Sequence, residues 1–134
     1  MTGLLVNIDV DDLEHAIEFY RDALDLKVSR RFGAGAAEMV GSLVPIYLLQ
    51  KKPGTPAFTD GPARDFHRHW TPVHLDFVVP DIARALARAE TAGARIESKV
   101  RTEKWGKIAF LSDPFGNGFC LIEFIGRGYD EILG

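Results

Sequence analysis

The chain has little cysteine: Cys120 is the only one among 134 residues. A single thiol cannot form an intrachain disulfide, which is typical of proteins in a reducing compartment, so we expect a cytoplasmic location. Long apolar runs are also missing, and none approaches the roughly 20 residues that span a bilayer. The opening stretch, MTGLLVNIDVDD, reaches acidic residues too early for a signal peptide. We therefore expect no membrane partner.

An excess of basic residues is absent too. The chain has 16 Lys and Arg against 19 Asp and Glu, a net charge of −3 and an isoelectric point near 5.8. Because no basic run or face is evident to neutralise phosphates, we expect no nucleic-acid partner. A hydrophobic content of 46% with 26% charged residues is ordinary for one globular domain of this length.

The first part of the chain predicts one strand, one helix and three more strands. Apolar residues alternate over 4–10, which places Asn7 and Asp9 together on the polar face of a strand. Asp11 or Asp12 then caps an amphipathic helix that continues to Leu24. Three short strands follow at about 27–32, 36–41 and 44–50.

The same pattern returns in the second part. A strand at 73–79 precedes a helix that starts at Pro80-Asp81, and strands follow at about 95–101, 107–112 and 119–125. The two helices superpose with an offset of 69 residues, so that Asp12-Leu13 matches Asp81-Ile82.

The sequence therefore predicts an α+β fold of two βαβββ copies. The modules are expected at 1–50 and 72–125, with a Pro- and Gly-rich linker at 51–71 and a tail at 126–134, together forming one domain.

The closing stretch LSDPFGNGFCLIEF, residues 111–124, predicts a hairpin around a tight turn. A strand, then Asp-Pro-x-Gly-Asn, then an apolar strand ending in Leu-Ile-Glu resembles the last hairpin of the vicinal oxygen chelate superfamily. That superfamily includes glyoxalase I, extradiol dioxygenases, methylmalonyl-CoA epimerase, and fosfomycin- and bleomycin-resistance proteins. The resemblance implies that the modules form an open, glyoxalase-like, eight-stranded cup, within one chain or across a swapped dimer. We expect a homodimer.

The resemblance also implies where a metal would be held. Family enzymes bind one divalent metal with four ligands, and those positions carry over to Leu5, Tyr47, His74 and Cys120. Of these only His74 matches the family pattern, so we expect no cofactor and no usual metal quartet. A divalent metal stays possible through His74 with Asp76 or Asn7, and oxygen ligands of that kind suit Mg²⁺ or Mn²⁺ better than Zn²⁺.

Several side chains are expected to line the cup and bind a small molecule. Asn7 and Asp76 occupy equivalent positions of the repeat, and they either bond each other or water, or hold a polar group of the ligand. Asp9 and Asp76 favour a cationic ligand if they stay unpaired. Phe115 and Phe119 are further candidates for an aromatic stacking surface. The full expected set of ligand-binding residues is Asn7, Asp9, Tyr47, His74, Asp76, Trp105 and Cys120.

Three functions remain open from the sequence. The leading hypothesis is a metal-free protein that binds a small organic ligand, similar to the bleomycin-resistance branch. The alternative is a metal-dependent lyase, isomerase or dioxygenase that acts on a vicinal-oxygen substrate around His74. A third is a thiol enzyme in which His74 activates Cys120, the two candidate catalytic residues. His67 and His69 are either a metal-binding pair or ordinary linker residues.

Overall fold

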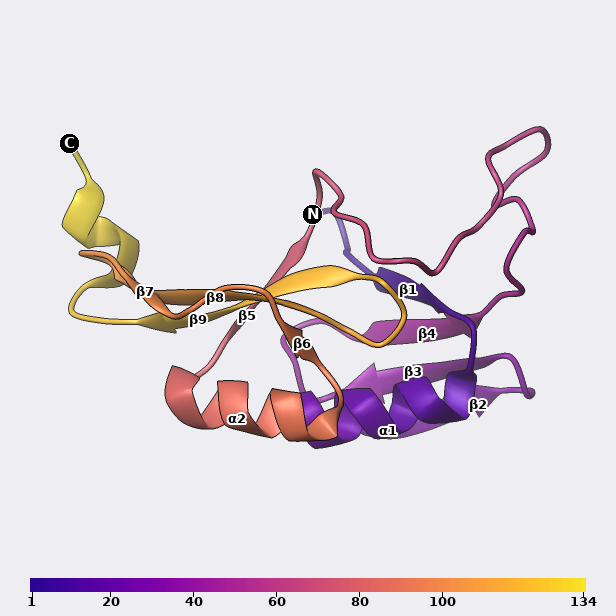
Figure 1. The fold of residues 1–134 in the computed structure, drawn as a ribbon, viewed down its shortest axis with the longest axis horizontal. Coiled ribbons are helices and arrows are strands. Elements are labelled where there is room, and N and C mark those ends of the chain that lie inside the picture. The colour runs from indigo at the N-terminus through magenta and orange to yellow at the C-terminus, as the bar shows by residue number, and fades with distance from the viewer. The chain divides into compact units, whose positions relative to one another are not determined.

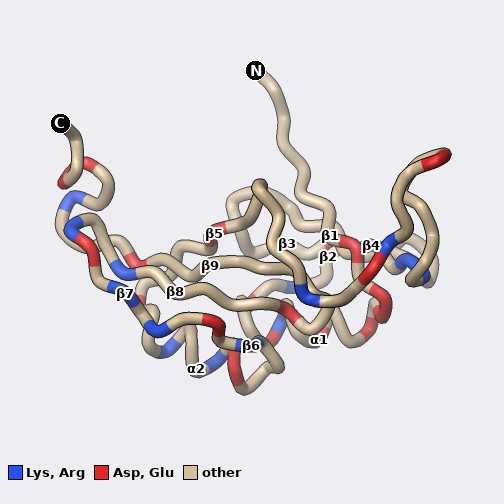
Figure 2. The backbone as a smooth tube through the Cα atoms, turned by 45° about the horizontal axis from the view of Figure 1, so that its top comes forward, with Lys and Arg blue, Asp and Glu red and all other residues tan.

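The computed structural model describes all residues, Met1–Gly134, and the chain divides into two compact units, Met1–His67 and Arg68–Gly134. The division falls inside the segment expected as a linker, and each unit carries one βαβββ module (Figure 1). Figure 2 shows acidic and basic residues interspersed along both units. No helix is long and apolar enough to cross a membrane.

The first unit is a four-stranded sheet covered by one helix. Its elements are β1 (Val6–Val10), α1 (Leu13–Leu24), β2 (Lys27–Phe32), β3 (Ala36–Val40) and β4 (Ile46–Gln50). The strand order is β1-β4-β3-β2, with β1 parallel to β4 and the other pairs antiparallel. Alternate residues of a strand face opposite sides, so one side of β3 and β4 buries its apolar residues against α1. The fully buried strand residues on this side include Ala37, Met39, Ile46 and Leu48.

The second unit repeats this plan with an extended hairpin. Its elements are β5 (Leu75–Val78), α2 (Ile82–Ala92), β6 (Arg95–Ile96), β7 (Arg101–Thr102), β8 (Gly106–Ser112), β9 (Gly118–Phe124) and the 3₁₀ helix η1 (Gly128–Ile132). The strand order is β5-β9-β8-β6, and β7 also pairs with β8. β5 runs parallel to β9, as β1 does to β4. The βαβββ repeat expected from the sequence is therefore present in both units.

The two helices begin with matching contacts. Asp12 caps α1 by accepting from the backbone N–H of His15 at 3.1 Å. Asp81 and Arg84 make the same contact at α2, also at 3.1 Å, and each lies 69 positions after its counterpart. The last strand of each module adds a second contact: Gln50 accepts from Leu13 N–H, and Glu123 accepts from Ile82 N–H, both at 2.8 Å. Side-chain oxygens thus satisfy orphan donors at both helix N-termini.

The expected strand at 95–101 is wrong as a single element, because β6 and β7 are two short strands. A side-chain contact with the neighbouring strand accompanies the interruption. Ser98 Oγ accepts from the backbone N–H of Phe110 at 2.9 Å, so a side chain takes the place of a backbone ladder partner. The first strand also starts later than expected, at Val6, and the expected 73–79 strand is shortened so that His74 precedes β5.

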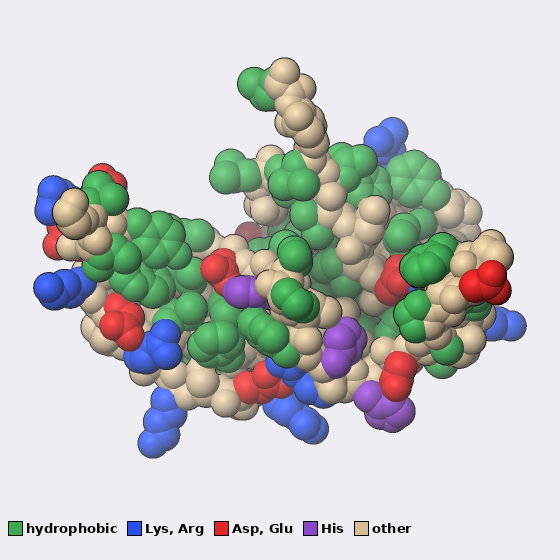
Figure 3. Space-filling model, turned by 90° about the horizontal axis from the view of Figure 1, so that it is seen from above, with side chains coloured by type: hydrophobic (Ala, Val, Ile, Leu, Met, Phe, Trp, Pro, Cys, Tyr) green, Lys and Arg blue, Asp and Glu red, His purple; other side chains and the backbone are tan.

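The C-terminal tail folds onto the end of the second sheet. Tyr129 of η1 packs on Trp105 and Phe124, with ring centroids 5.1 Å and 4.9 Å away. Gly128 lies so close to the Phe124 ring that an added Cβ would approach it to 3.3 Å, and it adopts a positive φ of 61°. Hydrophobic side chains gather beside the C-terminal turn, at the left of Figure 3. The tail is therefore an ordered cap on β8 and β9.

Candidate functional site

The pairing of β5 with β9 brings three predicted site residues together. Asp76 and Cys120 are Cα partners, and His74 lies two residues before Asp76. One potential ligand atom from each of the three residues lies within 4.8 Å of the others. His74 Nε2 is 3.2 Å from Asp76 Oδ1, and their side chains are 32% and 36% exposed. The sequence grouped His74 with Asp76, and the family resemblance placed Cys120 at the same site; the structure brings all three side chains together.

The environment of Cys120 keeps its thiol protonated. The residue is fully buried, and burial is the main cause that raises its pKa from 9.0 to about 12. The negative charge of Asp76 and a hydrogen bond from the thiol to that carboxylate raise the pKa further. A nucleophilic cysteine needs the opposite shift. These surroundings therefore disfavour the thiol-enzyme hypothesis.

An unexpected aromatic residue, Trp70, lies beside this cluster. Its ring centroid is 4.6 Å from the His74 ring and 5.7 Å from the Phe110 ring. Phe110 belongs to the same sheet face, because it is the Cα partner of Cys120 on β8. Trp70 is 43% exposed, and the Arg68 guanidinium carbon lies 5.7 Å from its ring centroid, so part of the ring is open to solvent. We name Trp70, His74, Asp76, Phe110 and Cys120 the β5–β9 site.

Trp70 reaches this face because position 118 is glycine. A Cβ on Gly118 would lie 2.5 Å from a Trp70 ring atom and 2.7 Å from Arg68 Nη2, well inside van der Waals contact. Sequence reasoning missed Trp70, since residues 51–71 have no strand or helix period. The one available signal was Gly118 itself, a residue without a side chain at the start of an otherwise apolar strand.

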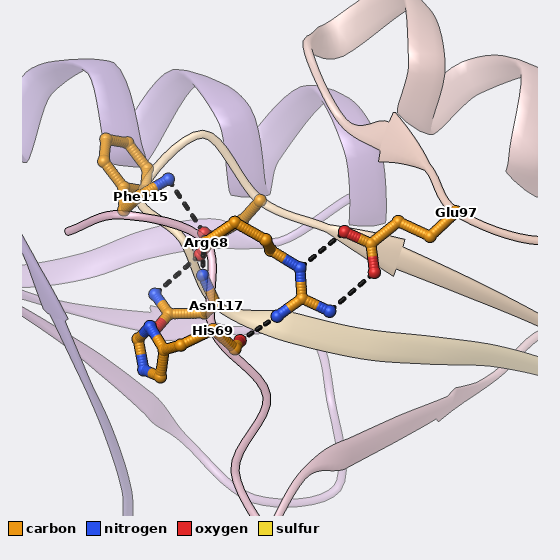
Figure 4. Close-up of polar contacts among 6 residues, drawn as sticks. Arg68, His69, Glu97, Phe115 and Asn117 are labelled. Carbon is orange, nitrogen blue, oxygen red and sulfur yellow. Dashed lines mark hydrogen bonds and ion pairs between the residues drawn. The ribbon is translucent and has the colours of Figure 1, made fainter.

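Arg68 and His69 fasten the segment that carries Trp70. Arg68 donates from Nε and Nη2 to the two carboxylate oxygens of Glu97, each at 2.5 Å, and from Nη1 to the His69 carbonyl (Figure 4). The hydrogen bonds between Arg68 and Glu97 raise the pKa of Arg68 and lower the pKa of Glu97. The backbone N–H of His69 donates to the Gly116 carbonyl at 3.1 Å.

The turn whose Gly116 carbonyl accepts from His69 is the expected Asp-Pro-x-Gly-Asn motif. Asp113 is buried and accepts from the backbone N–H groups of Phe115 and Asn117 at 2.8 Å and 2.9 Å (Figure 4). The Asn117 side-chain amide donates to its other oxygen at 3.0 Å. A side-chain scaffold of this kind is what the sequence predicted for the hairpin.

The first module has a second polar cluster, formed by Ser29, Arg30, Glu38 and Tyr47, which we name the Glu38 cluster. Tyr47 OH donates to Glu38 Oε2 at 2.5 Å, and this bond is the main cause that raises the Tyr47 pKa. Hydrogen bonds from Arg30, then from Ser29 and Tyr47, lower the Glu38 pKa to about 2. Sequence reasoning chose Tyr47 but missed Glu38, an acidic residue between the buried Ala37 and Met39.

The other predicted residues of the first module lie in different surroundings. Asp9 Oδ2 accepts a hydrogen bond from Arg64 Nε at 2.7 Å, so the charge of Asp9 is already paired within the unit. Asn7 is exposed on β1 and is the Cα partner of Tyr47, the position that matches Asp76 and Cys120 in the second module. Leu5 precedes β1 and is 62% exposed.

Two of the aromatic candidates are wrong for ligand contact. Phe115 and Phe119 are 2% and 3% exposed and belong to the core. Trp105 packs in the C-terminal aromatic cluster, with Phe124 at 6.2 Å and Tyr129 at 5.1 Å.

The two histidines of the HxH motif, His67 and His69, contact different parts of the chain. The His67 ring contacts Asp65 at 2.5 Å and is 93% exposed. His69 bridges to Asn117 through its backbone.

Comparisons with known proteins agree on one fold. A family model described as a glyoxalase-like domain matches residues 5–122. No curated protein sequence matches the chain.

Solved structures resemble the chain at low sequence identity. The fosfomycin resistance protein FosX from Listeria monocytogenes has a TM-score of 0.74 at 14% identity and covers 99% of both chains. A variant of that protein, complexed with Mn(II) and 1S,2S-dihydroxypropylphosphonic acid, has a TM-score of 0.71 at 14% identity and covers 96% of this chain and 91% of its own. A glyoxalase-related enzyme from Fulvimarina pelagi has a TM-score of 0.70 at 13% identity, covering 92% and 88%.

Proposed function

Because the chain belongs to the glyoxalase-like domain family of the vicinal oxygen chelate superfamily, we propose that it binds a small organic ligand at the β5–β9 site without the usual metal quartet. The observation that carries the proposal is the half-exposed Trp70 ring beside the His74–Asp76 pair. A flat apolar surface next to a few polar groups is the usual composition of a small-molecule site.

The chemistry of the site favours a planar ligand with a positive charge. The exposed part of the Trp70 ring attracts flat apolar groups, whereas the Arg68 guanidinium carbon already lies 5.7 Å from the ring centroid, so the preference for a cation rests on Asp76. Asp76 supplies a carboxylate that is 36% exposed and can accept charge-assisted hydrogen bonds from an ammonium or amidinium group. Asp9 contributes less to this preference than the sequence suggested, because Arg64 already pairs with it.

The first prediction concerns Asp76. Benzamidine is expected to bind saturably and to quench Trp70 fluorescence, whereas its neutral analogue benzamide binds about tenfold or more weakly. Asp76→Asn keeps the side-chain shape and removes the charge, so it should abolish the preference for benzamidine. The titration is done in a Trp105→Phe background, since the chain has two tryptophans.

Asp22→Asn is the matched control, because Asp22 is an exposed carboxylate on α1 in the other module. It should leave both affinities unchanged. Equal binding of benzamidine and benzamide to the unmodified β5–β9 site would contradict the assigned ligand chemistry, and absence of binding by either would contradict the site.

A second candidate function is supported by the donor set itself. His74, Asp76 and Cys120 would give a metal three protein ligands and leave one position open, the number of protein ligands in catalytic zinc sites. Imidazole and thiolate donors suit Zn²⁺ better than the Mn²⁺ found in the FosX variant. A bound metal would polarise vicinal oxygens of a substrate. Against this candidate, burial and the Asp76 carboxylate favour the protonated thiol of Cys120 in the metal-free protein, and coordination requires the release of that proton.

The second prediction separates these two candidates by metal content. Purified protein is offered Mn²⁺, Fe²⁺, Ni²⁺ or Zn²⁺, desalted, and assayed for metal per chain. The ligand-binding proposal predicts a ratio near zero for every metal. A ratio near one with Zn²⁺, lost in both His74→Ala and Cys120→Ser, would favour the metal-dependent enzyme instead. His67→Ala controls for exposed histidine outside the cluster.

A further inference from the structure

The Glu38 cluster of the first module presents a fixed arginine to solvent. Arg30, Glu38 and Tyr47 are successive Cα partners across β2, β3 and β4, so they form a row on one face of the sheet. This face is opposite to the one that packs on α1, because the neighbours of Glu38 on β3, Ala37 and Met39, are fully buried. From this row we infer that Arg30 is a binding site for an oxyanion group, a carboxylate or a phosphate-type group, of a small molecule.

The first step of the argument is the way Glu38 holds the guanidinium. Arg30 donates from Nε to Glu38 Oε1 at 2.9 Å and from Nη2 to Glu38 Oε2 at 3.0 Å. Glu38 is itself held in place, since its side chain is 11% exposed and also accepts from Ser29 Oγ and Tyr47 OH. A carboxylate bound on several sides positions the arginine that it contacts.

The second step is the edge of the guanidinium that remains open. A guanidinium carries five N–H groups in a planar fork. The bonds to Glu38 use the Nε side of that fork, and Tyr47 also interacts with the guanidinium. The outer edge, formed by Nη1 and the outward N–H of Nη2, is directed away from the Glu38 carboxylate. The Arg30 side chain is 64% exposed, so this edge is accessible. Two parallel N–H groups match the two oxygens of a carboxylate or a phosphate.

The third step is preorganisation. The Arg30 guanidinium carbon lies 5.3 Å from the centroid of the Phe32 ring, so the plane is supported by an aromatic ring as well as by Glu38. An exposed arginine normally loses side-chain entropy when it binds an anion, and here that freedom is already restricted. Glu38 and Arg30 together are formally neutral, so an approaching anion meets no net negative charge from the pair.

A plain cross-strand ion pair is the competing interpretation. Such a pair at a surface contributes little to stability, and it does not require that the outer N–H groups of the guanidinium bind a ligand. The two interpretations differ in one property, because only the proposed site binds small oxyanions through Arg30. The inference does not depend on the β5–β9 site, which lies in the other unit.

The third prediction is tested by NMR on the full chain. Methylphosphonate and propionate are titrated separately at constant ionic strength, with sodium chloride as the compensating salt. We expect a saturable shift of the Arg30 Nε–H resonance and of the Phe32 amide, with at least one of the two probes. A stronger response to methylphosphonate identifies a phosphate-type group, and a stronger response to propionate identifies a carboxylate.

Two variants make the test decisive. Arg30→Lys keeps the charge and loses the fork, so affinity should fall about tenfold or more. Arg31→Gln is the matched control, because Arg31 is the next residue, is also exposed, and binds Glu14 rather than Glu38. It should leave probe binding unchanged. Absence of a saturable shift with both probes, or equal affinity of wild type and Arg30→Lys, would overturn the inference; a thermal melt shows that each variant is folded.

Discussion

Native Cys120 is expected to react with iodoacetamide at pH 8 about a thousandfold more slowly than a free cysteine. The thiolate is the reactive form, and each unit by which the pKa is raised lowers its population tenfold. The Cys120 pKa is raised from 9.0 to about 12, a difference of three units, and the residue is also fully buried. The measurement is the rate of carboxamidomethylation by mass spectrometry, in native buffer and in urea.

The unfolded chain provides the control, since it should react at the rate of an ordinary cysteine. Asp76→Asn removes the negative charge that helps to raise the pKa, so the folded variant should react faster than the wild type. Rapid modification of the folded wild type near neutral pH would instead support an activated thiol and return the thiol-enzyme hypothesis to consideration.

The same raised pKa gives stability a defined pH dependence. Between pH 9 and about 12 the unfolded chain releases the thiol proton while the folded chain keeps it. The unfolded state then binds fewer protons, so the contribution of Cys120 to the free energy of unfolding falls as pH rises through this window. It is fully present below pH 9. Urea unfolding at pH 8 and pH 10.5, with Cys120→Ala as reference, measures the difference.

The sequence could predict those parts of the fold that local patterns of residues specify. The helices were found because their apolar residues repeat at helical spacing and an aspartate caps each start. The repeat followed from the common offset of Asp12 and Asp81. The broken strand at β6 and β7 could not be found in this way, since the contact that accompanies it joins Ser98 and Phe110, which are far apart along the chain.

The candidate site was predictable only where alternation along a single strand decides which residues share a face. Two-residue alternation placed His74 and Asp76 on one face, and that reasoning needs no knowledge of other strands. The pairing of Asp9 with Arg64 spans 55 positions, so no local pattern indicates that its charge is already paired. Trp70 was missed for a similar reason, because its place is set by Gly118 and Arg68 rather than by a periodic segment.

Glu38 differs from Asp9 and Trp70, because the sequence contains a pattern that indicates its contacts. Glu38 is a charged residue, and the residues before and after it in β3 are apolar. Arg30 on β2 and Tyr47 on β4 lie on the same face of the sheet as Glu38. The strand order β4-β3-β2 was implied by the repeat and the short connections. Cross-strand pairing of Glu38 with both residues was therefore a reasonable deduction from the sequence.

Asp113→Ala is expected to lower the free energy of unfolding by about 2–4 kcal/mol. The buried carboxylate accepts from the Phe115 and Asn117 backbone N–H groups, and each would be left without its partner at a cost of roughly 1–3 kcal/mol. For a domain of this size that is a fall in Tm of roughly 10 °C. Urea unfolding and a thermal melt measure both values.

Asp113→Ala should also increase the mobility of Trp70. This effect would distinguish the variant from one that disturbs the turn alone. The turn supplies the Gly116 carbonyl that accepts from His69, and Trp70 follows directly in the chain. In the Trp105→Phe background, the Trp70 fluorescence should shift to the red in the folded variant, and benzamidine binding should weaken. Asp113→Asn is the matched control: it keeps an oxygen for the two backbone donors but loses the charge and the oxygen that accepts from the Asn117 amide, so its effect should be smaller. Equal, small losses in both variants would show that Pro114 and the glycines hold this turn without Asp113, and that the motif does not position the β5–β9 site.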